Sequence, residues 1–179
     1  MKAIFLDRDG VLNKPLIKNR KSFAPRLFSE FKLYPNIAKD CSELKKKGYL
    51  LIVVTNQPDV DKGLLKISEL KKMNSFLKKK IDYDKMYISY SSSNKSFYKK
   101  PNPGMLKKAQ KKFNLNISNC YLIGDRWRDI EAAENINCKA VFIDRNYKEK
   151  KPTYQIISVK SFSSAVKYIT RSKYNEKKN

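Results

Sequence analysis

Short apolar runs alternate with amphipathic segments along most of the chain. Two runs, Ala3 to Leu6 and Tyr49 to Val54, lack charged residues, as expected for strands that are buried on both faces. Further strands are predicted at Met86 to Ser89, Tyr121 to Ile123, Ala140 to Ile143 and Ile156 to Val159. Helical spacing predicts helices from Ile37 to Gly48, from Ser68 to Lys80, after Pro103-Gly104, from Asp129 to Asn135 and around Ala165 to Ile169. This alternation predicts an α/β fold with a doubly wound, Rossmann-like parallel sheet and helices on both faces.

Two segments fall outside the alternation. Val11 to Tyr34 has no helical period but carries Phe23, Phe28 and Phe31, which predicts an irregular flap with one short strand pair. The charged residues 171–179 predict a frayed basic tail, so we expect a single domain over residues 1–170. The predicted elements leave no room for a large cap domain, and we therefore expect an open site.

The chain contains no histidine. This excludes Ser-His-Asp and Cys-His catalysis and the usual histidine sites for zinc or iron. Catalysis must then use carboxylates, lysines, hydroxyls and a metal that prefers oxygen, such as magnesium.

The net charge is +23, and clusters of basic residues can bind nucleic acid. Lysine far outnumbers arginine, however, and most lysines fall on the polar faces of predicted helices. A solvated surface is therefore the preferred interpretation, and a nucleic-acid partner is the alternative.

Cysteine usage and apolar run length bear on the compartment. Cys41, Cys120 and Cys138 are far apart in mixed or apolar stretches, which indicates buried, reduced thiols. The longest apolar run is too short to span a bilayer, and Asp7 interrupts the first run before a signal-type core could form. We expect a cytoplasmic monomer with no membrane association.

Four polar clusters follow predicted strands or precede a predicted helix. They are Asp7 with Asp9, then Thr55-Asn56-Gln57, then Lys99-Lys100, and Asp125-Arg126. Ligands of open α/β sheets bind beyond the carboxyl ends of the strands, so these clusters are expected to meet at one edge. Several of these residues have a structural alternative, as does the nearby Asp129: Thr55 could cap a helix, Lys100 could be one surface lysine among many, Asp125 could belong to a turn, and Asp129 could offset a helix dipole.

The four motifs resemble those of the haloacid dehalogenase (HAD) superfamily of phosphohydrolases. Within it they are similar to the subgroup of heptose-bisphosphate and histidinol-phosphate phosphatases. The segments that carry the resemblance are Phe5-Leu6-Asp7-Arg8-Asp9-Gly10, Thr55-Asn56-Gln57, Lys100-Pro101-Asn102-Pro103-Gly104-Met105 and Gly124-Asp125-Arg126.

The resemblance implies a role for each catalytic residue. Asp7 would attack phosphorus to form an aspartyl-phosphate, and Asp9 would serve as general acid and then base. Mg²⁺ would be held by Asp7, the backbone carbonyl of Asp9 and Asp125, with Asp129 as a candidate for the outer shell of the site. Thr55 and Lys100 would stabilise the phosphoryl group as its charge spreads.

The resemblance also places Asn56, Gln57, Lys99 and Arg126 near the substrate. It implies a small phosphorylated metabolite, first D-glycero-D-manno-heptose 1,7-bisphosphate of lipopolysaccharide heptose biosynthesis, hydrolysed at its 7-phosphate. The alternatives are a histidinol-phosphate phosphatase, a polynucleotide 3′-phosphatase and a non-catalytic nucleic-acid-binding relic. Lys99 stands where the heptose-bisphosphate enzymes usually carry arginine, and a lysine lacks the planar fork for bidentate recognition of a second phosphate.

A second departure concerns the segment Ser89 to Tyr98. Members of the subgroup often carry a Cys/His zinc loop here, but this segment contains neither residue type. We therefore expect no structural zinc. Packing of Tyr90, Phe97 and Tyr98 would have to order the loop, or it would be mobile.

Overall fold

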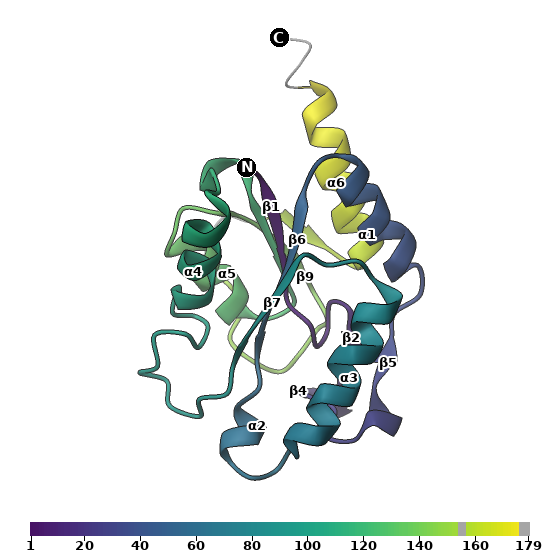
Figure 1. Ribbon diagram of the computed structural model, residues 1–179, viewed down its shortest axis with the longest axis vertical. Coiled ribbons are helices and arrows are strands. Elements are labelled where there is room, and N and C mark those ends of the chain that lie inside the picture. The colour runs from purple at the N-terminus through teal and green to yellow at the C-terminus, as the bar shows by residue number, and fades with distance from the viewer. Residues whose placement is uncertain (154–156, 176–179) are drawn as a thin grey trace.

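A six-stranded parallel sheet forms the centre of the computed structural model, which describes residues 1–153 and 157–175 (Figure 1). The strand order is β10-β9-β8-β1-β6-β7. The strands are β1 (Ala3–Leu6), β6 (Leu50–Asn56), β7 (Lys85–Ser89), β8 (Tyr121–Gly124), β9 (Lys139–Ile143) and β10 (Ile157–Val159). Every pairing in this sheet is parallel, which confirms the predicted fold class. Ile156, the first residue of the last predicted strand, lies outside the described residues.

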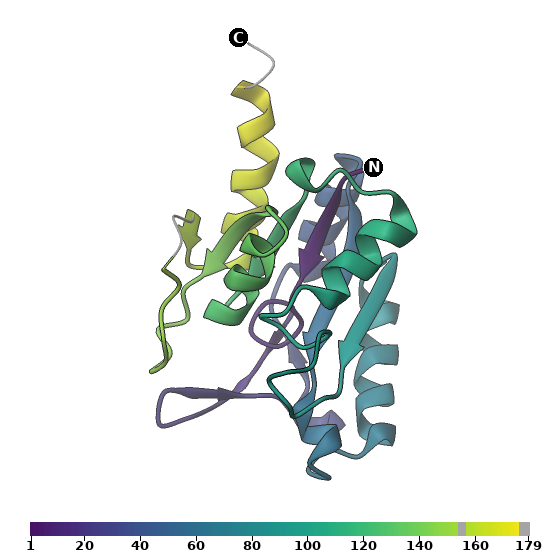
Figure 2. The same cartoon turned by 90° about the vertical axis from the view of Figure 1, so that its left-hand side faces the viewer.

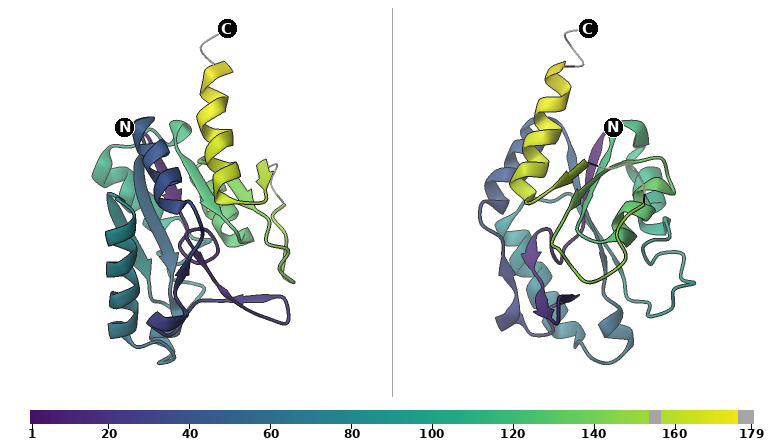
Figure 3. Two further views of the ribbon diagram at one scale, coloured as in Figure 1. Left: turned by 90° about the vertical axis from the view of Figure 1, so that its right-hand side faces the viewer. Right: turned by 180° about the vertical axis from the view of Figure 1, so that it is seen from behind.

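Helices cover both faces of the sheet (Figures 1 and 3). One face packs against α1 (Ile37–Lys46), α3 (Ile67–Lys80) and α6 (Phe162–Asn175), and the other against α4 (Gly104–Phe113) and α5 (Trp127–Glu134). Alternate residues of β1 supply the two cores: Ile4 and Leu6 point to the first face, Ala3 and Phe5 to the second. This is why the strand sequence is apolar without interruption.

Some predicted boundaries were wrong. β6 runs through Thr55 and Asn56, so Thr55 is a strand residue and not the cap of a following helix. The short helix α2 (Pro58–Asp61) begins three residues later, without a side-chain cap. α6 continues through Asn175, past the predicted helix around Ala165 to Ile169, while residues 176–179 lie outside the described part.

The flap between β1 and α1 contains two strand pairs, where the sequence predicted one. β2 (Asn13–Lys14) pairs with β5 (Lys32–Leu33), and β3 (Leu16–Lys18) pairs with β4 (Lys21–Phe23). The turn of the second hairpin has positive φ at both Asn19 and Arg20, the conformation that matches the twist of a two-residue hairpin. This hairpin projects from the body beyond the carboxyl end of β1 (Figure 2).

Chain order places the site at a reversal of direction across the sheet. After β1 the chain builds outward to β6 and β7, then crosses back to β8 on the other side of β1. The carboxyl ends of β1 and β8 therefore flank the crevice where ligands of such sheets bind.

Two further expectations can be compared directly with the structure. All three cysteines are buried and free of disulfides, as predicted. Among the described residues, no helix combines the length and apolar character required to cross a bilayer.

Candidate active site

Asp7 and Asp125 directly follow the neighbouring strands β1 and β8, as the sequence predicted. Gly10 allows the turn after β1 to pass close to Asp125. Its φ of +95° is unfavourable for other residues, and a Cβ there would lie 1.7 Å from Asp125 Oδ2. Gly124 permits a similar approach, since its Cβ would lie 2.2 Å from Asp129 Cβ. Two glycines thus allow three acidic residues to gather.

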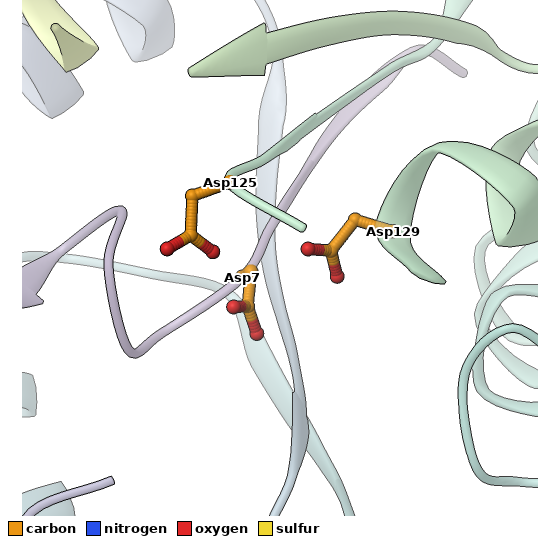
Figure 4. Close-up of side chains that lie close together, drawn as sticks. All are labelled: Asp7, Asp125 and Asp129. Atoms are coloured by element: carbon orange, nitrogen blue, oxygen red, sulfur yellow. The ribbon is translucent and has the colours of Figure 1, made fainter. Parts of the chain in front are cut away.

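The carboxylates of Asp7, Asp125 and Asp129 form a buried acidic cluster (Figure 4). Each offers an oxygen atom, and these atoms lie within 4.8 Å of one another. Burial, partly countered by Lys100, raises the pKa of Asp7 to about 7, and burial with repulsion from Asp7 and Asp129 raises the pKa of Asp125 well above its usual range. Asp125 Oδ1 is buried without a hydrogen-bond partner in the described chain.

These properties fit a divalent cation. Oxygen donors are the ligands of a hard ion such as Mg²⁺, and a bound cation would remove the repulsion among the three carboxylates. The unpartnered Asp125 oxygen is an additional coordination position. The cluster brings the predicted metal ligands Asp7 and Asp125 together with Asp129, the candidate for the outer shell.

Lys100 connects the nucleophile candidate with Asp129. Its Nζ lies 2.7 Å from Asp7 Oδ1 and 2.6 Å from Asp129 Oδ1, and it donates a third bond of 2.7 Å to the carbonyl of Val54. Burial alone would disfavour the ammonium, but Asp129 and Asp7 outweigh it and raise the pKa of Lys100. Lys100 is therefore a fixed, fully charged cation beside Asp7.

Asp129 has two sets of contacts, one at the start of α5 and one in the acidic cluster. As the third residue of α5 it accepts a hydrogen bond from the backbone N–H of Arg126 at 3.1 Å, which satisfies a free donor at the helix start. Its other oxygen pairs with Lys100 and contributes to the acidic cluster.

Four hydrogen bonds hold the carboxylate of Asp9. Arg8 Nη2 donates to both oxygens at 3.1 and 3.0 Å, Asn13 donates to Oδ1 at 2.9 Å, and Gln57 donates to Oδ2 at 2.7 Å. Gln57 also donates to the hydroxyl of Thr55 at 2.9 Å, which leaves the Thr55 proton free for another acceptor. Gln57, predicted to contact substrate, thus joins Thr55 to Asp9.

The sequence interpretation overlooked Arg8, which is fully buried. Its Nη1 donates to Asn74 at 2.9 Å, and its guanidinium lies 5.4 Å from the centre of the Phe31 ring. A charged residue between two acidic residues on a buried strand end was the available signal, because a buried arginine requires an acidic partner.

Tyr147 and Arg145 were also overlooked. The Tyr147 hydroxyl donates to Asp125 Oδ2 at 2.7 Å, and Arg145 Nε donates to the carbonyl of Gly10 at 3.0 Å. Both belong to the irregular segment after β9, where no periodicity indicates which side chains turn inward.

Three of the predicted substrate contacts already have partners within the protein. The amide of Asn56 clamps the backbone of Lys100, with a 3.0 Å bond at each end. Lys99 Nζ donates to the carbonyl of Ser92 at 2.5 Å and to Asn94 at 2.9 Å. Arg126 forms three hydrogen bonds to Glu149.

Aromatic packing in the loop before Lys100 is limited to Phe97 and Tyr98, whose ring centres lie 5.5 Å apart in an edge-to-face arrangement. Tyr90, Phe97 and Tyr98 are 43, 50 and 46% exposed. Hydrogen bonds order the loop: Asp61 accepts from the backbone and hydroxyl of Ser92, and Lys99 binds the loop from inside. A buried ammonium can order this loop because it has several donors to distribute.

A cavity of about 470 Å³ opens above these residues, the size of a small-molecule site. Asp7, Asp9 and Lys100 line it together with Ser22 and Phe23 of the flap hairpin. The remaining lining comes from Ala24 and Arg26 after the hairpin, the end of β6 and the segment after it, the 92–99 loop and the start of α5.

Comparison with known proteins agrees with this geometry. Residues 97–159 match the HAD-hydrolase-like family model. The chain is 30% identical to the D-glycero-alpha-D-manno-heptose-1,7-bisphosphate 7-phosphatase of Campylobacter jejuni over 83% of this chain and 86% of that protein. It is 28% identical to the D-glycero-beta-D-manno-heptose-1,7-bisphosphate 7-phosphatase of Haemophilus ducreyi, over 82% and 85%.

A solved structure confirms the fold. The D,D-heptose 1,7-bisphosphate phosphatase from B. bronchiseptica, complexed with magnesium and phosphate, superposes with a TM-score of 0.82 at 18% identity, covering 96% of this chain and 99% of that one. The sequence relatives and the four motifs at one sheet edge together show that the chain belongs to the HAD superfamily of phosphatases, in the subgroup that includes the heptose-bisphosphate phosphatases.

Proposed function

We propose that this phosphatase removes the 7-phosphate of D-glycero-D-manno-heptose 1,7-bisphosphate, with Mg²⁺ as cofactor and Asp7 as nucleophile. The observation that carries the proposal is the contact of Asp7 with Lys100 inside the buried acidic cluster, at the floor of a cavity of small-molecule size. The substrate follows from the names of the relatives, which cover most of the chain.

The cofactor would be held by Asp7 and Asp125, with Asp129 beside them and the carbonyl of Asp9 as a further ligand. When bound, Mg²⁺ supplies positive charge that offsets the repulsion between the nucleophile and the phosphoryl oxygens.

In the first step a carboxylate oxygen of Asp7 attacks phosphorus, and the bond from phosphorus to the sugar oxygen breaks. Asp9 gives its proton to that leaving oxygen, which departs as the sugar hydroxyl. Lys100 neutralises charge on the phosphoryl group, and the Thr55 hydroxyl can donate to one of its oxygens because Gln57 occupies only the acceptor side.

In the second step Asp9 accepts a proton from water as that water attacks the phosphorus of the aspartyl-phosphate. The bond from phosphorus to Asp7 breaks, phosphate leaves, and both carboxyl groups return to their initial states. The hydrogen bonds from Gln57 and Asn13 aim the Asp9 carboxyl during both transfers.

Phosphate release tests this proposal. Wild-type protein with Mg²⁺ is assayed on heptose 1,7-bisphosphate, histidinol phosphate and a 3′-phosphorylated oligonucleotide. We expect turnover of the bisphosphate, loss of activity in Asp7→Asn and strong slowing in Asp9→Asn. Normal turnover in Asp7→Asn would refute the nucleophile assignment.

The same panel separates the alternative substrates. Turnover confined to the oligonucleotide and falling steeply with salt would identify a polynucleotide 3′-phosphatase. Turnover confined to histidinol phosphate would identify that activity, and no turnover on any substrate would favour the non-catalytic relic.

A further inference from the structure

Six basic side chains line the cavity above the acidic cluster, and most already have an acceptor within the protein. They are Arg26, Lys62, Lys99, Lys100, Arg126 and Arg128. Arg26 pairs with Asp59 at 2.8 Å and Lys100 with Asp7, while Lys99 and Arg126 have the loop and Glu149 partners given above.

Lys62 and Arg128 differ from the other four. Neither side chain makes a hydrogen bond or ion pair with any residue in the described ranges. The guanidinium of Arg128 only lies over the ring of Trp127, 4.8 Å from its centre. Their charges are therefore available to a ligand in the cavity.

Lys62 and Arg128 both lie near Lys99 in the cavity. After burial, Arg128 and then Lys62 are the largest causes that lower the pKa of Lys99, so both lie close enough to repel its ammonium. The cations that surround Lys99 therefore repel one another, and a bound anion would relieve this repulsion.

Lys62 and Arg128 come from elements that follow the two strands on either side of β1. Lys62 directly follows α2, beyond β6, and Arg128 is the second residue of α5, beyond β8. Asp7 directly follows β1, the strand between β6 and β8. A ligand with one phosphoryl group at Asp7 can therefore present a second anionic group to the rim, where the planar guanidinium of Arg128 suits the oxygens of a phosphate.

We propose that Lys62 and Arg128 bind the second phosphate of a sugar bisphosphate and so determine the preference for bisphosphates over monophosphates. This inference rests on the proposed phosphatase function and extends it to residues that the sequence motifs did not indicate. Lys62 and Arg128 thus take the place of Lys99 and Arg126 as the expected anion-binding pair, because Lys99 already donates hydrogen bonds to the loop and Arg126 already pairs with Glu149.

Steady-state kinetics test the proposal on heptose 1,7-bisphosphate and on heptose 7-phosphate, which lacks only the second phosphate. In Arg128→Gln and in Lys62→Gln we expect KM for the bisphosphate to rise about 10-fold or more, as for loss of a charge-assisted contact, with kcat unchanged. KM for the monophosphate should stay within about 2-fold. Lys46→Gln, which removes the same charge from the exposed end of α1 at the opposite edge of the sheet, should change neither value.

Two results would overturn the subsite: an equal rise of KM for both substrates, or no rise for either. If the wild type hydrolyses other phosphate esters but not the heptose compounds, the substrate proposal fails, and fructose 1,6-bisphosphate and fructose 6-phosphate provide the same comparison. If it hydrolyses none, titration calorimetry with fructose 1,6-bisphosphate decides: weaker binding by both variants supports the subsite, and binding equal to wild type refutes it.

Discussion

Replacing Asp125 with asparagine should stabilise the metal-free protein while destroying its metal site. The wild type gathers three buried carboxyl groups within 4.8 Å, and an asparagine at this position would keep the shape and the acceptor for Tyr147 without the charge. Function and stability therefore conflict at this position, as they do when like charges are gathered for catalysis.

The magnitude follows from the charges. Two ionised carboxylates about 5 Å apart repel by about 3 kcal/mol at an effective dielectric constant of 20. A carboxylate can avoid this repulsion by binding a proton. At pH 7 protonation costs at most about 4 kcal/mol, because each pH unit above the ordinary carboxyl pKa adds about 1.36 kcal/mol. Lys100 offsets part of the repulsion, so we expect Asp125→Asn to raise the free energy of unfolding by about 1–3 kcal/mol. Each kcal/mol corresponds to a rise in Tm of roughly 2–4 °C for a protein of this size.

The stability gained by Asp125→Asn should increase with pH. The raised pKa values of Asp7, about 7, and of Asp125 mean that the folded protein binds more protons than the unfolded chain above pH 4. Stability of the metal-free wild type should therefore fall as pH rises from about 4 to 7. The advantage of Asp125→Asn should grow over the same interval.

Calorimetric melting in EDTA at pH 5 and pH 7.5, repeated with Mg²⁺, measures both effects. Mg²⁺ should raise the Tm of the wild type and leave that of the variant unchanged. Asp144→Asn is the matched control, since Asp144 faces Lys151 at 2.7 Å and has its pKa lowered by that contact, so its loss should slightly destabilise. A metal-free Asp125→Asn protein that melts below the wild type would refute this reasoning.

Three further variants examine the rest of the site. Lys100→Met should reduce kcat by at least about 100-fold and destabilise the protein by about 3–5 kcal/mol in urea titration, because it leaves buried carboxylates unpaired; retained kcat would contradict its role. Arg8→Met should lower kcat and stability by freeing the Asp9 carboxylate, and unfolding curves that match the wild type would count against this. Tyr147→Phe should raise the Mg²⁺ concentration for half-maximal activity about 10-fold or more with little change in saturated kcat, since the hydroxyl orients Asp125; unchanged Mg²⁺ dependence would argue against this orientation.

The order of apolar and polar residues was enough to predict the parallel sheet and the edge at which the chemistry occurs. Apolar runs such as Ala3 to Leu6 can be buried only in a sheet covered on both faces, so periodicity is sufficient to predict the layers. Asp7 and Asp125 directly follow such runs, and the register of parallel strands brings them together.

Which polar side chains have partners could be learned only from the folded molecule. Lys99 and Arg126 have the right charge for a second phosphate, but Ser92 and Glu149, distant in sequence, engage them. Lys62 and Arg128 have no such partner in the described chain and carry no motif. Whether a charge is available depends on contacts between loops that have no periodicity, and these contacts exist only once the sheet has brought the loops together.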